Sequence, residues 1–81
     1  MNFEVGKYYR YTNRSWLALS ENYPYIGSSC IVNSNSFIVL EKVDEYRVVI
    51  WGIIEVFKVL CNGRIYYNTI TENAKMYYEA L

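Results

Sequence analysis

Short apolar runs, separated by polar or glycine-containing turns, make up most of the chain after residue 28. Enrichment in Val, Ile and aromatic residues predicts strands at residues 30–32, 37–43, 46–51 and 53–61. The apolar positions of the last segment also fit a helical stripe, but its Ile, Val and Phe content favours a strand. The pattern therefore predicts a mainly β protein.

Three polar segments are expected to turn the chain between these strands: residues 33–36, Asp44-Glu45 and Asn62-Gly63. Gly52 is expected to permit a bend or a bulge. Asn-Gly between two apolar runs is typical of a two-residue hairpin turn with positive backbone φ angles. That turn predicts a register with Leu60 opposite Ile65, Val59 opposite Tyr66 and Lys58 opposite Tyr67.

The two ends of the chain differ in character. Residues 5–12 alternate roughly and predict a first strand, whereas residues 13–27 are rich in turn-forming residues and predict a long surface loop. Within that loop, Trp16, Leu17 and Leu19 are apolar enough to contact the core. Near the C-terminus, a capping box over residues 69–72, or Thr71 alone as N-cap, predicts a helix over residues 73–81.

These elements fit one domain of residues 1–81 that is mainly β, with an α+β character at the C-terminus. The expected architecture is a small, strongly bent antiparallel sheet or partly open barrel of five or six strands, followed by one short helix. Cys30 and Cys61 lack the spacing of redox or zinc sites. We expect two buried free thiols, with a single disulfide as the alternative.

The composition favours binding over catalysis. The chain has ten tyrosines and no histidine, so the commonest general base and the commonest metal ligand are both missing. We therefore expect no enzymatic activity, no cofactor and no metal site. The cluster of Glu41, Asp44 and Glu45 is interpreted as a solvated turn.

Charge and hydropathy limit the classes of partner that the sequence predicts. Eight basic and eight acidic residues give a formal net charge of zero. Neutrality disfavours duplex DNA, whose binding depends on neutralised phosphates, but leaves single-stranded nucleic acid open because stacking contributes there. No signal peptide or membrane-spanning run is visible, so we expect a cytoplasmic protein with no membrane partner.

The segment from Lys7 to Trp16 interleaves cations with aromatic residues, and no acid occurs between Glu4 and Glu21. On a strand, Lys7 shares one face with two tyrosines, while Tyr8 and Arg10 share the other. Three interpretations stay open: ordinary sheet packing, a protein-binding surface, and contact with single-stranded nucleic acid or a nucleotide. The residues of the nucleic-acid interpretation are Lys7, Tyr8, Tyr9, Arg10, Tyr11 and Arg14.

Tyr23-Pro24-Tyr25 is a second candidate, because a proline between two tyrosines makes a rigid aromatic knob suited to an interface. The alternative is that these rings fold back over the sheet edge. Tyr77 and Tyr78 raise a similar question, since adjacent helical residues point about 100° apart and cannot both face one core.

The opening segment of residues 3–11, with its Val-Gly-Lys and tyrosines, resembles the start of small SH3-like β-barrel proteins. Tyr25-Ile26-Gly27, the apolar run of residues 37–40 and the Asn-Gly hairpin extend the resemblance to about half the chain. Many short phage-encoded accessory and anti-defence proteins look like this. The resemblance implies a binding or inhibitory role, and it transfers no functional residue.

The sequence therefore predicts a small, non-catalytic, phage-derived binding protein that inhibits or modulates a host protein, in the host cytoplasm, by occupying its surface. Its expected partner-binding residues are Tyr9, Arg10, Arg14, Trp16, Tyr23 and Tyr25. The alternative is a binder of RNA, single-stranded DNA or a signalling nucleotide. A homo-oligomer formed through the apolar stretch of residues 46–61 is compatible with either.

Overall fold

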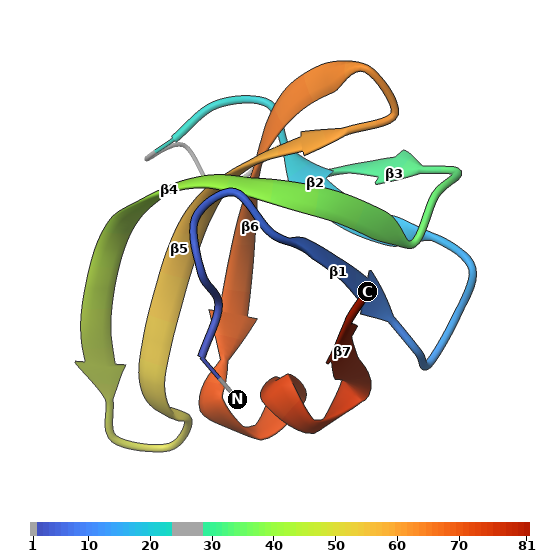
Figure 1. The fold of residues 1–81 in the computed structure, drawn as a ribbon. Helices are drawn as coiled ribbons and strands as arrows, with labels where there is room; N and C mark the ends of the chain where they lie inside the picture. The colour runs from blue at the N-terminus through green and yellow to red at the C-terminus, as the bar shows by residue number, and fades with distance from the viewer. Residues whose placement is uncertain (1, 24–28) are drawn as a thin grey trace.

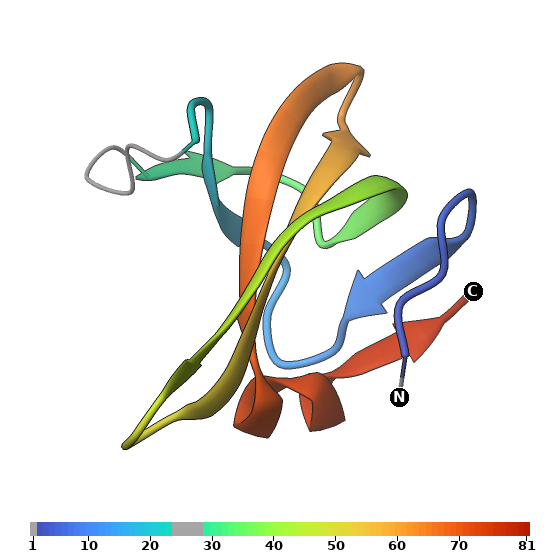
Figure 2. The same cartoon turned by 90° about the vertical axis from the view of Figure 1, so that its left-hand side faces the viewer.

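The computed structural model describes residues 2–23 and 29–81, which form a seven-stranded antiparallel sheet. The order across the sheet is β3-β2-β6-β5-β4-β1-β7, and the sheet curls into half a barrel (Figure 1; Figure 2). The mainly β prediction is confirmed. The elements are β1 (Tyr8–Tyr11), β2 (Leu17–Ser20), β3 (Ser29–Val32), β4 (Ser36–Val48), β5 (Gly52–Cys61), β6 (Arg64–Thr71), the 3-10 helix η1 (Glu72–Tyr77) and β7 (Tyr78–Ala80).

The curl originates in the long β4–β5 hairpin. Its register shifts twice, once between Val39 and Glu41 and again between Lys42 and Asp44. Each shift places an extra residue in β4, and such bulges bend a strand and increase its twist. Two bulges within one thirteen-residue strand therefore turn the sheet back on itself and create a concave face.

Aromatic and aliphatic side chains fill this concave face. Phe37 and Phe57 are almost completely buried, and Tyr78 from β7 packs edge-on against Phe37 with ring centroids 5.9 Å apart. Phe3, ahead of β1, contacts Tyr9, Phe57 and Tyr78 at 4.7, 5.3 and 5.3 Å. The N-terminal segment and β7 thus close one side of the core.

The predicted turn at Asp44-Glu45 is wrong, and the predicted strand over residues 46–51 is correct only for residues 46–48, which belong to β4. Because the bulges disrupt the alternation in this part of β4, the two acidic residues remain inside a continuous strand. The chain turns later, at residues 49–51, where the Trp51 amide donates to the Val48 carbonyl at 3.2 Å. Gly52 then adopts φ +71°, which agrees with the expected bend.

Two further predictions need correction, because residues 13–27 contain a strand and residues 73–81 do not form an α-helix. Leu17 and Leu19 bury themselves as β2, which adds a strand to the expected five or six. Near the C-terminus, Thr71 makes no side-chain capping bond, and β7 pairs with β1 through Tyr11 and Tyr78. Burial of Tyr78 as a strand residue limits the helical turn to η1.

No helix among the described residues has the length and apolar character needed to cross a membrane.

The Asn-Gly hairpin is confirmed, with φ +53° at Asn62 and +77° at Gly63 and with all three predicted cross-strand pairs in place. Both cysteines are free, as expected. Cys61 is buried, and burial raises the pKa of its thiol. Cys30 is only half-buried, which corrects the expectation that both thiols lie in the core.

A buried carboxylate ties the hairpin to η1. Glu55, on β5, forms ion pairs with Lys75 of η1 and, at 3.1 Å, with Lys42 of β4. Burial alone would raise the pKa of Glu55, but the two ammonium groups reverse that effect and hold it below its ordinary value. The ionised carboxylate therefore stabilises the fold.

The Asn-Gly turn predicts the effect of changing Gly63 to alanine. A Cβ there would meet no atom within 4 Å, so the only cost is the positive φ. Gly63→Ala should lower the free energy of unfolding by about 1–2 kcal/mol, measured by urea denaturation. The control Asn62→Gly, which accepts the same φ, should change it by less than about 0.5 kcal/mol. Equal effects of the two changes would contradict this turn geometry.

Glu55 predicts an acid-dependent stability. Because its native pKa is lowered, its contribution is present above the unfolded-state pKa of about 4.3 and is lost as the pH falls through the native value. Glu55→Gln should lower the free energy of unfolding by about 1–3 kcal/mol at pH 7. Below about pH 4 the difference from wild type should shrink. Glu41→Gln, an exposed change on β4, is the control, and an equal loss there would contradict the assignment.

Candidate functional site

The structure divides the aromatic and basic residues of β1 between two faces. Tyr9 is a core residue with 2% of its surface exposed, and its hydroxyl accepts a hydrogen bond from the Glu4 amide at 2.6 Å. Tyr8 and Arg10 lie on the outer face, in agreement with the predicted alternation. Lys7 pairs with Glu4 and Arg10 with Glu79. Two of the expected cations are therefore already neutralised, and one expected ring is inaccessible.

The Tyr23 side chain packs onto the sheet. Its ring lies 5.9 Å from that of Tyr67, and its hydroxyl donates a hydrogen bond to the Asp44 carboxylate. That hydrogen bond, assisted by desolvation, raises the pKa of Tyr23 to about 12. Tyr25, the other tyrosine of the expected knob, lies outside the described residues.

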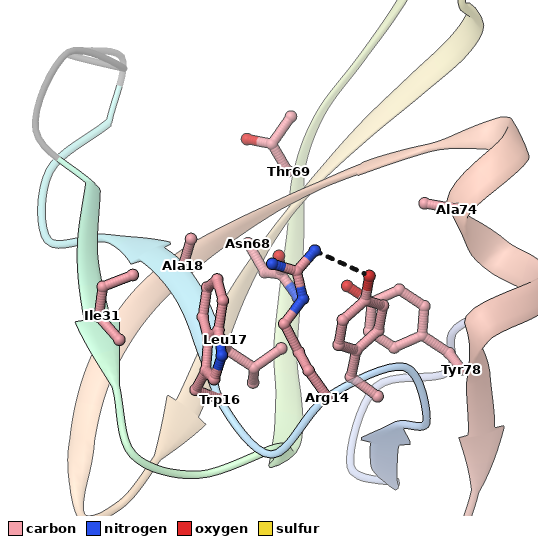
Figure 3. Close-up of a pocket in the computed structure, with 10 residues that line it drawn as sticks. Arg14, Trp16, Leu17, Ala18, Ile31, Asn68, Thr69, Ala74 and Tyr78 are labelled. Carbon is pink, nitrogen blue, oxygen red and sulfur yellow. Dashed lines mark hydrogen bonds between the residues drawn. The ribbon is translucent and has the colours of Figure 1, made fainter.

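Arg14 and Trp16, by contrast, are brought together by the connection between β1 and β2. The Arg14 guanidinium stacks over the Trp16 indole, 4.2 Å from the ring centroid, and lies 5.5 Å from the centroid of Tyr11 (Figure 3). One guanidinium nitrogen donates to the Tyr11 hydroxyl at 3.4 Å, which lowers the pKa of that tyrosine. Three residues of the sequence-predicted cluster therefore meet at one place.

This place is a cavity of about 320 Å³ at the open seam of the half-barrel. Within the described strands, β2 pairs with β6 only at Ser20 and Tyr67, and the two strands then separate. The cavity occupies the resulting gap, beside Leu17 and Ala18 of β2 and Asn68 of β6. Figure 3 shows these side chains around Arg14, with Tyr78 and Ala74 on the opposite wall.

Asn68 is a cavity residue that the sequence pattern did not indicate. Its side chain is only 4% exposed, and its amide nitrogen has no hydrogen-bond partner among the described residues. Burial raises the pKa of the neighbouring Tyr78, and the Asn68 amide partly offsets that rise although it makes no well-formed hydrogen bond. The only sequence signal was the register of the Asn-Gly hairpin, which puts Asn68 on the same face as Tyr66.

The tip of the β4–β5 hairpin is a second exposed feature. Val49 is fully exposed, Ile50 is 82% exposed and Trp51 is 57% exposed. Figure 2 shows this end of the hairpin projecting beyond the rest of the sheet. The sequence analysis assigned these residues to a strand, so it did not identify them as surface.

No protein-family model, curated protein or solved structure matches this chain. Within residues 2–23 and 29–81, no three His, Cys, Asp or Glu side chains gather into a metal-binding group.

Proposed function

We propose that the chain is a small non-catalytic binding protein that modulates another protein by occupying its surface. The observation that carries this proposal is the hairpin tip, where Val49, Ile50 and Trp51 stand uncovered side by side. Three adjacent apolar side chains at a projecting end are a costly arrangement unless another molecule covers them. Tryptophan is also among the residues that contribute most to protein–protein interfaces.

The charges beside the tip favour a protein partner over an anionic lipid surface. Arg47 lies just before the tip in β4, but Glu45 and Glu72 lie close by, and a Cβ at Gly52 would clash with the Glu72 carboxylate. Anionic lipids select clusters of basic residues, whereas protein interfaces combine an apolar centre with a rim of both charges. The tip has the composition of a protein interface, with an apolar centre beside both acidic and basic residues.

The mechanism is steric. Its anchors differ from those expected from sequence, because Tyr9 belongs to the core and Tyr23 packs on Tyr67. The ion pairs of Glu55, a few residues from the tip, hold this part of the hairpin in place and reduce the entropic cost of presenting the apolar tip. The resemblance to phage anti-defence proteins suggests a bacterial protein as the partner.

Ile50→Asp tests the proposal. The change places a charge in the centre of the tip, so it should weaken partner binding by at least about tenfold. It should change the free energy of unfolding by less than about 0.5 kcal/mol, because the side chain is exposed. The measurement is capture from nuclease-treated bacterial lysate, followed by titration of the purified partner.

Ile65→Asp is the matched control, since Ile65 is an exposed isoleucine on β6, away from the tip. The control should bind like wild type. Equal binding by the Ile50 variant, or capture of nucleic acid that nuclease removes, would overturn the proposal.

A further inference from the structure

The seam cavity combines an apolar wall with polar side chains that can form hydrogen bonds. Leu17, Ala18 and Ile31 form one side, while Arg14 and Asn68 supply the N–H groups. No acidic side chain lines the cavity within the described part of the chain. An anion with an apolar body would therefore satisfy both the N–H groups and the apolar wall.

Arg14 carries a positive charge that no acid among the described residues balances. Five of the eight basic side chains form ion pairs with carboxylates, and Arg14 is not among them in the described residues. Stacking on Trp16 holds the guanidinium plane in place, and the N–H groups that do not contact the Tyr11 hydroxyl are available to a ligand. The N–H edge of a guanidinium matches the two oxygens of a carboxylate in a bidentate pair.

Asn68 supplies an independent observation. Asn68 lines the cavity, and its amide nitrogen is buried and lacks a hydrogen-bond partner among the described residues. An unpaired buried donor destabilises a fold, and native proteins contain few of them. A ligand oxygen in the cavity would supply the missing acceptor.

We propose that the seam cavity is a binding site for a carboxylate attached to a small apolar group. The carboxylate would take the N–H edge of Arg14 and the amide of Asn68, with its apolar part against Leu17 and Ile31. One guanidinium balances one negative charge, so a monoanionic carboxylate suits the cavity better than a dianionic phosphate. The proposal concerns a different surface from the hairpin tip and does not depend on the function proposed above.

The test uses Trp16 as a reporter. In a Trp51→Phe background Trp16 is the only tryptophan, so its fluorescence follows events in the cavity. We expect saturable changes with acetate and stronger ones with butanoate, whose chain reaches the apolar wall. Butanamide, and inorganic phosphate at matched ionic strength, should have little effect. Equal responses to butanoate and butanamide, tighter binding of phosphate, or no response to either acid at millimolar concentration would overturn the proposal.

Variants then assign the donors. Arg14→Gln changes an exposed side chain and should weaken butanoate binding by about tenfold or more. Arg64→Gln removes the same charge outside the cavity and should leave binding unchanged. Asn68→Leu should weaken binding without lowering the thermal midpoint, because it removes an unpaired buried amide. Unaltered binding in the Arg14 variant would overturn the proposal even if the Asn68 variant failed to fold.

The carboxylate could belong to a free acid or to the end of a peptide. A short peptide ending in leucine, compared with its C-terminal amide, separates these sources. Binding of the free-acid peptide would assign the site to a chain terminus, and binding of butanoate alone would assign it to a small acid. Both results support a carboxylate site, whereas equal binding of peptide and amide would contradict it.

Discussion

The two β-bulges in β4 determine the shape of the molecule. Without the register shifts after Val39 and after Lys42, the β4–β5 hairpin would be a flatter ribbon unable to enclose the rings of Phe37 and Phe57. The same curl carries the hairpin tip beyond the sheet and leaves β3 and β7 as unpaired edges of the half-barrel. The enclosed core and the projecting tip therefore both depend on these two bulges, whereas the open seam lies where β2 separates from β6.

The sequence predicted the fold best where local chemistry decides the backbone conformation. Asn62-Gly63 accepts two positive φ angles at little cost, so the turn and the whole β5–β6 register could be read from two residues. Asp44-Glu45 has similar polarity but no such requirement. Its place inside β4 depends on bulges that only pairing with β5 reveals, which is why the predicted turn was wrong and the apolar tip was assigned to a strand.

The residues of the candidate site also differ in how far the sequence could predict them. Arg14 and Trp16 could be identified as candidate site residues from the sequence, because a cation between aromatic residues is apparent from the order of residues alone. Their stacking depends on the path of the β1–β2 connection, and the burial of Tyr9 depends on which face of β1 packs on the core. Asn68 could not be selected, since a polar residue at a buried strand position becomes informative only when its lack of a partner is known.

The hairpin tip and the seam cavity differ in how replacing their residues would affect the stability of the fold. The tip could become polar without disturbing the core, because Val49 and Ile50 contact little of it. Asn68 lies on the buried face of β6, where an aliphatic residue would satisfy packing and remove an unpaired donor. Selection for stability alone would favour that replacement, because the unpaired amide destabilises the protein whenever no ligand is bound. The buried Asn68 amide, next to an Arg14 guanidinium that forms no ion pair among the described residues, is therefore the feature on which the proposed carboxylate site depends.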